Sequence, residues 1–230
     1  YIIAQTYWAN GDWSNGWQNN TKLWHDDRPG GKWRFMLMDM DFGMGLSGAS
    51  PYDDYINTAG DEGYLTDQLF GAVIQNDEFR TYFINRYADL MNTEYQIDQV
   101  TEMAYEMRDQ VVPVFQRHAQ RWGTNADALN GALESRLDWA EQRVQGSRDV
   151  VQTHFDLVEQ VDITLDVLPA GAGRIHISTI EPDEAEYPWT GVYYQGNPVR
   201  ITVYENPGYT FSHWAPNYIF SSNNTTRTHT

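Results

Sequence analysis

The stretch Lys32-Trp-Arg-Phe-Met-Leu-Met-Asp39-Met-Asp41-Phe-Gly43 decides the fold near the start of the chain. An apolar run that stops at Asp-x-Asp-Phe-Gly predicts a buried strand that delivers carboxylates to a site, because such carboxylates need a cation or hydrogen-bond donors. Asp12 and the pair Asn19-Asn20 lie upstream. Chemistry on a magnesium-bound nucleotide requires these groups: one carboxylate that orients a nucleophile, and carboxylates with an amide that hold the metal.

Alternatives remain open for these residues. Side chains two apart in an extended segment face opposite ways, so Asp39 and Asp41 reach one metal only if the backbone turns. The competing interpretation is a strand end with two solvated carboxylates, and Asp12 taken alone is typical of an Asx turn. A helix-loop-helix calcium loop is excluded, because it needs Asp or Asn at its fifth position and Glu at its twelfth, where this chain has Gly43 and Ser50.

Composition places the chain among acidic globular proteins. Its 230 residues are 41% hydrophobic and 14% aromatic, which is enough apolar surface to form a core. A net charge of -17 argues against a nucleic-acid partner. No apolar run is long enough for a membrane span, and the absence of cysteine excludes disulfides and thiolate zinc sites. The composition is compatible with a secreted or cell-envelope protein of a bacterium.

The pattern of apolar residues predicts an α+β chain of two domains. Residues 63 to 158 have three- and four-residue spacing typical of packed helices, and Pro113 is expected to end or kink one of them. We expect Asp77 and the pair Thr124-Asn125 to cap the helices that follow them. From Val161 onward the period changes to two, which predicts a small antiparallel β-domain over residues 161 to 230. The boundary is expected at residues 156 to 161.

Other reactive side chains show no spacing that indicates a site. The six histidines lack metal-ligand spacing, and the serines lack a nearby His/Asp arrangement of the hydrolase type. The chain begins at Tyr1 rather than Met, so we expect it to be cut from a longer protein with any targeting segment upstream.

The motifs together resemble the spore coat protein H (CotH) kinase family. The resemblance rests on the order Asn10-Gly-Asp12-Trp13, Asn19-Asn20, Lys22-Leu-Trp24 and the Lys-Trp-Arg stretch that ends in Asp39-Met-Asp41-Phe-Gly43. The helical residues 76 to 92 and the region from Trp122 to Arg143 also resemble that family. The similarity covers about residues 1 to 158.

This resemblance implies the C-terminal, mainly helical lobe of an atypical protein-kinase-like fold with a short catalytic strand. Such an enzyme transfers the γ-phosphoryl group of ATP, with Mg²⁺ (Mn²⁺ or Ca²⁺ in its place), to Ser or Thr of a protein substrate. By motif position, Asp12 is the catalytic Asp, and Asn20 or Asn19 with Asp39 or Asp41 holds the metal. Because no Gly-rich loop or strand Lys precedes this region, the nucleotide-gripping lobe is expected to be missing and the fragment inactive by itself.

The β-domain resembles bacterial surface modules of the internalin-B-repeat type, through Gly173-Arg-Ile-His-Ile-Ser-Thr and Gly208-Tyr-Thr-Phe-Ser-His-Trp214. Such modules act as spacers or adhesive domains at the cell surface, with protein or glycan contacts. The alternative hypothesis is therefore a non-catalytic surface or secreted binding protein, in which the acidic loops hold structural Ca²⁺.

Overall fold

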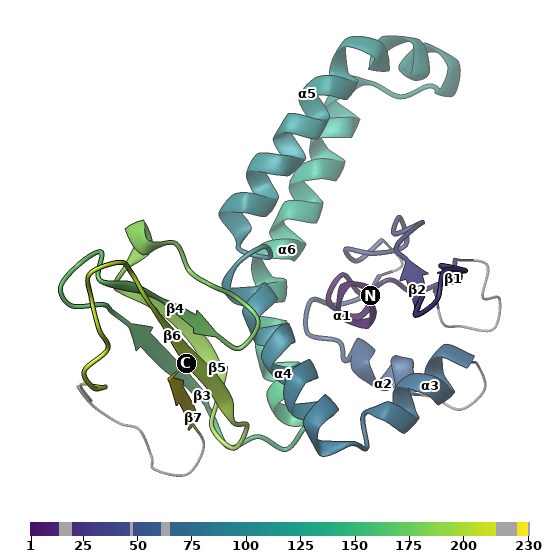
Figure 1. Ribbon diagram of the computed structural model, residues 1–230. Helices are drawn as coiled ribbons and strands as arrows, with labels where there is room; N and C mark the ends of the chain where they lie inside the picture. Colours follow the sequence, from purple (N-terminus) through teal and green to yellow (C-terminus); the bar gives the residue numbers. More distant parts are fainter. Residues whose placement is uncertain (14–19, 47, 61–64, 215–224, 230) are drawn as a thin grey trace. The chain divides into compact units, whose positions relative to one another are not determined.

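The computed structural model describes residues 1–13, 20–46, 48–60, 65–214 and 225–229. It has the predicted α+β composition, with long helices before residue 155 and most strands after it (Figure 1). The chain forms two compact units. Unit 1 comprises Tyr1–Ala72 and Glu94–Val150, and unit 2 comprises Val73–Thr93 and Val151–Thr230. Among the described helices, none combines the length and the apolar character needed to cross a membrane.

Unit 1 is made of helices and one β-hairpin. Its elements are α1 (Ile2–Tyr7), β1 (Lys22–His25), β2 (Trp33–Met36), α2 (Tyr55–Gly60), most of α3 (Leu65–Val73), α5 (Ile97–Trp122) and most of α6 (Ala126–His154). Helix α1 packs on α2. The large buried side chains of this unit come from the short helices, the loop after α1 and the inner half of α6: Tyr7, Trp13, Ile56, Leu137 and Trp139.

Arg143 of α6 joins α1 to the loop before α2. Its side chain is 1% exposed. The guanidinium donates to the carbonyl oxygens of Thr6 and Tyr7, both at 2.7 Å, and to those of Pro51 and Asp53 at 2.7 and 2.9 Å. Carbonyls at the end of a helix lack intrahelical partners and carry partial negative charge, so a cation satisfies them well. This contact holds the start of the chain in place.

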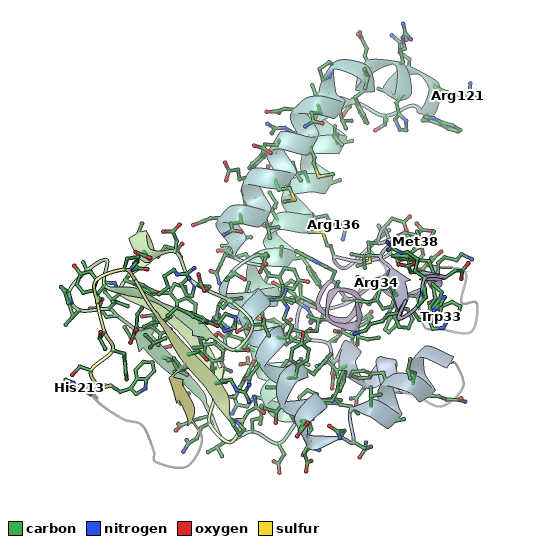
Figure 2. All side chains as sticks on the ribbon, in the orientation of Figure 1. Trp33, Arg34, Met38, Arg121, Arg136 and His213 are labelled. Atoms are coloured by element: carbon green, nitrogen blue, oxygen red, sulfur yellow. The ribbon has the colours of Figure 1, made fainter. Side chains whose placement is uncertain are left out.

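The strand predicted to be buried is exposed. Strand β2 pairs antiparallel with β1, with Lys22 opposite Met36. Trp33 is 69% and Leu37 is 55% exposed, and Figure 2 labels Trp33 with its neighbours Arg34 and Met38 around this strand. The prediction of burial was wrong because the described hairpin is a two-stranded sheet. An apolar run does not reveal whether a second layer covers it.

Helices α5 and α6 form a long hairpin within unit 1 (Figure 1). Pro113 does not end α5, which continues to Trp122 and closes at Gly123 with φ +67°. Figure 1 shows α5 changing direction in its second half, as expected of an internal proline. The predicted cap of α6 is confirmed, since Asn125 Oδ1 accepts from the backbone N of Ala128 at 2.9 Å.

Unit 2 combines one helix with the β-rich end of the chain. Its elements are α4 (Asp77–Asn92), the end of α6, β3 (Gln160–Leu165), β4 (Gly173–Ile177), the 3-10 turn η1 (Glu184–Glu186), β5 (Trp189–Tyr194), β6 (Val199–Glu205) and β7 (Thr225–His229). The predicted antiparallel pairing is found for β3 with β5 and for β4 with β6. Strand β7 instead runs parallel to β6.

Helix α4 begins at Asp77, the residue that the sequence predicts to be its N-cap. Asn76 is the N-cap and accepts from the backbone N of Phe79 at 2.9 Å, whereas Asp77 is already helical. The prediction for Asp77 was wrong because Asn and Asp are equally good caps and they are adjacent here. The predicted apolar face is confirmed by the burial of Phe83, Tyr87 and Met91.

A second face of α4 is polar and binds the β-strands. Asn85 Nδ2 donates to the carbonyl of Pro198 at 2.7 Å, and the amide of Asn92 exchanges two hydrogen bonds of 3.0 Å with the backbone of Val192. Asp89 lies between them. It accepts from the backbone N and Oγ1 of Thr179 at 2.9 and 2.6 Å and from the hydroxyl of Tyr193 at 2.7 Å. Helix α4 and the strands therefore fold as one body.

Candidate active site

Asp12 and Asn20 contact each other across the loop that follows α1. Nδ2 of Asn20 donates to Oδ2 of Asp12 at 2.9 Å, and Asn20 is buried. Oδ1 of Asp12 is also inaccessible to water, and no described residue donates to it. Of the two candidate amides, Asn20 is therefore in contact with Asp12, while Asn19 lies outside the described residues.

Asn10 connects this loop to the residues after β2. Its side chain is 1% exposed, and its Nδ2 donates to Oε1 of Gln5 at 2.8 Å and to the backbone carbonyl of Asp39 at 3.3 Å. Ala9, just before it, has φ +51°, so the chain reverses sharply as it leaves α1. Sequence analysis assigned no role to Asn10. Its position two residues before Asp12, in a motif with ordinary turn composition, was the only signal.

The backbone turns at Asp39, and this brings the two carboxylates of the Asp-x-Asp together. Asp39 has φ +51°, a left-handed conformation that Asp adopts more readily than most residues. A hydrogen bond between the carboxyl groups of Asp39 and Asp41 raises the pKa of Asp39; the charge of Asp41, desolvation and the charge of Asp12 raise it further. Asp12 and Asp41 therefore both lie close enough to Asp39 to raise its pKa.

Gly43 allows the chain to pass close to the end of α1. The backbone N of Met44 donates to the carbonyl of Trp8 at 2.7 Å. A Cβ on Gly43 would lie 2.8 Å from that same carbonyl oxygen and 3.0 Å from the carbonyl oxygen of Met40. Both contacts involve backbone, which cannot move aside, so a larger residue would displace the turn that holds Asp41. The glycine of Asp-Phe-Gly therefore has a packing role here.

The chemistry of the donor set fits a magnesium ion. Within the described residues, no group of three or more His, Asp or Glu side chains is arranged as a ready-made metal cluster. A Mg²⁺ site needs fewer protein ligands, because the ion is commonly held by one or two carboxylates together with waters and substrate phosphates. The crowded pair Asp39 and Asp41, and the buried oxygen of Asp12 for which no described residue is a donor, are carboxylates that a cation would stabilise.

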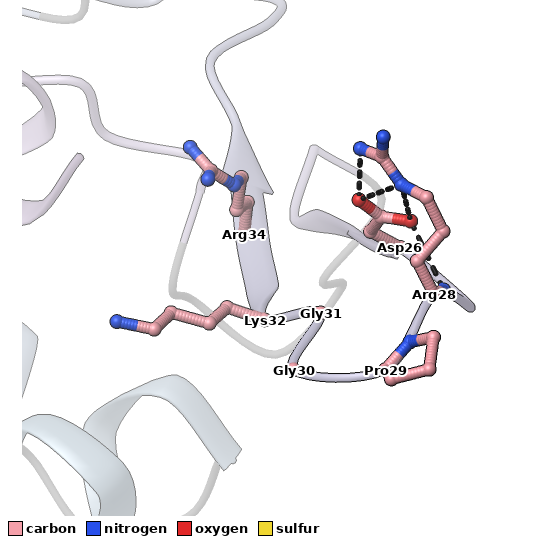
Figure 3. A pocket seen from close by; sticks show the side chains of 7 residues that line it. All are labelled: Asp26, Arg28, Pro29, Gly30, Gly31, Lys32 and Arg34. Carbon is pink, nitrogen blue, oxygen red and sulfur yellow. Dashed lines mark hydrogen bonds and ion pairs between the residues drawn. The ribbon is translucent and has the colours of Figure 1, made fainter.

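A hollow of about 400 Å³ lies elsewhere, in the loop between β1 and β2. Figure 3 shows its lining, in which the side chains of Lys32 and Arg34 lie apart from the pair Arg28 and Asp26. Nε of Arg28 donates to both carboxylate oxygens of Asp26 at 2.9 Å, and this hydrogen bonding lowers the pKa of Asp26. The lining includes none of the described candidate residues, Asp12, Asn20, Asp39 and Asp41. It is therefore not the site that the sequence predicts.

The candidate residues therefore form an Asp–Asn pair and an Asp-x-Asp turn, and the charge of Asp12 acts on the pKa of Asp39. Comparison with known proteins identifies the family. Residues 1–147 match the family described as CotH kinase protein, and the chain belongs to this family. Neither a curated protein nor a solved structure matches the chain.

Proposed function

We propose that this chain carries the catalytic and metal-binding residues of a protein kinase that transfers the γ-phosphoryl group of ATP to Ser or Thr of a protein. One observation carries the proposal: Asp12, Asn20, Asp39 and Asp41, which are distant in sequence, converge through a 2.9 Å hydrogen bond and a shared electrostatic environment. Membership of the CotH kinase family supports the same assignment. Bound Mg²⁺ would neutralise the charge of the ATP phosphates during transfer.

The four residues have distinct roles in this proposal. Asp12 accepts the proton of the acceptor hydroxyl, whose oxygen forms a bond to the γ-phosphorus while the bond from that phosphorus to the bridging oxygen of ADP breaks. Asn20 positions Asp12 through its Nδ2 and offers its amide oxygen to the metal. Asp39 and Asp41 supply the carboxylate ligands, with the turn at Asp39 determining which oxygens face the cation.

The cellular setting is part of the proposal. The family takes its name from a spore coat protein, and the net charge of -17 suits a protein exposed to the environment, so we place the protein outside the cell or in the bacterial envelope. The β-strands of unit 2 would then act as an accessory module that contacts the cell surface or the acceptor protein.

The test is phosphate transfer by the protein that the complete gene encodes. With γ-labelled ATP, Mg²⁺ and a Ser/Thr peptide library, Asp12→Asn and Asp39→Asn should each lower the rate by about 10²–10⁴-fold, because a positioned base or metal ligand contributes that much. Asp27→Asn is the matched control, since this exposed carboxylate lies in the same unit and should leave the rate unchanged. Undiminished transfer by Asp12→Asn and Asp39→Asn would refute the assignment.

A wild-type protein without kinase activity would favour the alternative hypothesis, a non-catalytic binding protein. If it transfers no phosphate, and Ca²⁺ raises its melting temperature in a way that Asp39→Asn abolishes, the acidic turn is a structural calcium site in a binding protein.

A further inference from the structure

Helix α5 has an apolar stripe that faces solvent. Its members recur at intervals of three, four and four residues, and this 11-residue pattern occurs twice along the helix. Met103 and Met107 are each 62% exposed, Val114 is 67% exposed, and no residue of α5 is buried. A long helix that keeps one apolar face in water is typical of a protein-binding surface. The stripe comprises Val100, Met103, Met107, Val111, Val114, His118 and Trp122.

Helix α6 does not cover this stripe. The side of α5 that contacts α6 includes Tyr105, whose hydroxyl donates to Glu134 at 2.8 Å. At about 100° per residue, Met107 near the centre of the stripe lies almost half a turn from Tyr105, and every other member of the stripe lies more than a quarter of a turn from it. The two faces of α5 are therefore separate, and the stripe remains available to a partner.

The charges beside the stripe change sign at the bend. Glu102 and Glu106 flank it before Pro113, whereas Arg117 and Arg121 flank the same side after it. No Asp or Glu occurs in α5 after Asp109, and Arg108, the one Arg or Lys before the bend, is paired with Asp109 at 2.6 Å. Figure 2 labels Arg121 near the end of α5. One helix therefore carries an acidic arm and a basic arm beside one apolar surface.

We propose that this surface binds a second copy of the same chain, with the two α5 helices antiparallel about a twofold axis near Val111. Met107 then lies opposite Val114 of the other copy. In an antiparallel pair, equivalent flanks meet, so Glu106 lies near Arg117 of the other copy and Glu102 near its Arg121. In a parallel pair, each Glu would lie next to the same Glu of the other copy and each Arg next to the same Arg, and this repulsion is unfavourable. This interface does not depend on the proposed enzymatic function.

The first test measures self-association of the whole chain by sedimentation velocity over a range of concentrations. We expect the wild type to dimerise. The variants Glu102→Arg/Glu106→Arg and Arg117→Glu/Arg121→Glu should each dimerise about tenfold or more weakly, because each flank then has one sign. An equal mixture of the two variants should recover the dimer as a heterodimer. A wild type that stays monomeric, or a mixture that associates no better than its parts, would overturn the proposal.

The control has the same charge change in unit 2. Glu159→Arg/Asp162→Arg alters two exposed carboxylates near and on β3, and it should leave dimerisation as in the wild type. Circular dichroism on every variant should show unchanged helix content. Equal weakening in this control would mean that net charge, and not the α5 flank, governs association, and would also overturn the proposal.

The second test determines direction. The chain contains no cysteine, so single substitutions report cleanly. Met107→Cys mixed with Val114→Cys should form disulfide-linked dimers between the two variants in preference to either variant with itself. Cross-linking of each variant mainly with itself would exclude the antiparallel arrangement.

Discussion

Asp39 in unit 1 and Asp89 in unit 2 both have a raised pKa, but the physical cause differs between them. Burial raises the pKa of Asp89, while hydrogen bonds from Thr179 and Tyr193 partly offset the effect. Asp39 is exposed, and its pKa is raised mainly by its hydrogen bond with Asp41 and by the charges of Asp41 and Asp12. The carboxylate of Asp89 has donors on both oxygens, whereas the carboxylate of Asp39 faces other carboxylates.

This difference separates a structural carboxylate from one suited to a ligand. Substituting Asp89 removes an acceptor from donors that have already lost their water, which is costly. Substituting Asp39 removes a repulsion that the fold tolerates, which is typical of binding sites whose charge is compensated by the ligand. A raised pKa is therefore not by itself a marker of function; the partners of each oxygen decide the interpretation.

The largest expected effect is that of Asp89→Ala on stability. The change leaves the Tyr193 hydroxyl and the Thr179 amide without their acceptor, and we expect a loss of about 3–5 kcal/mol in the free energy of unfolding. Urea unfolding measures it. Asp162→Ala, an exposed position on β3, should change stability by less than about 0.5 kcal/mol. A cost for Asp89→Ala as small as that of the control would show that the contact is not structural.

The next effect is that of Tyr193→Phe. This variant keeps the ring buried but removes the hydroxyl that donates to Asp89 at 2.7 Å. Because hydrogen bonds to carboxylates contribute more than neutral ones, we expect a loss of about 1.5–3 kcal/mol in urea unfolding. Tyr204→Phe is the control, since this residue is 40% exposed on β6 and should tolerate the change. Equal losses in the two variants would contradict the prediction.

A smaller effect is the pH dependence that Asp89 contributes. Its folded pKa lies above the ordinary value of 3.8, so its contribution to stability is fully present below pH 3.8 and is lost as the pH rises through the folded pKa. The variant Asp89→Asn does not ionise. The stability difference, wild type minus variant, should therefore fall with rising pH above 3.8 and then level off. A difference that rises with pH would reverse the assignment.

The smallest expected effect is that of Asp39→Asn without metal, and its sign is opposite. Removing one of two interacting carboxylates should leave stability unchanged or slightly raised, because repulsion with Asp41 and Asp12 is lost. Added Mg²⁺ should raise the melting temperature of the wild type but not of Asp39→Asn. Thermal scans with and without Mg²⁺ measure both. A clear loss of stability in metal-free Asp39→Asn would mean that this turn is structural, like Asp89.

The sequence was informative wherever a local pattern specifies the outcome. Period-two alternation located β3, β4 and β6, and three- and four-residue spacing located the long helices. It failed for the burial of β2, because the number of layers over a strand is not encoded in the strand itself. It also missed the contacts of Asn85, Asp89 and Asn92, although their spacing along α4 places three polar residues on one helical face, a signal that could have been used.

The sequence by itself determined which residues are available for chemistry: the Asp and Asn side chains before and after a Lys-Trp-Arg stretch, in an order that resembles one kinase family. Only the tertiary structure decided that Asn20 reaches Asp12, that the turn at Asp39 brings its carboxyl group to Asp41, and that Asn10 and Gly43 hold the loops in place. The physical reason is that order along the chain specifies local conformation. Distances between loops depend on buried contacts, such as those of Arg143, between residues far apart in sequence.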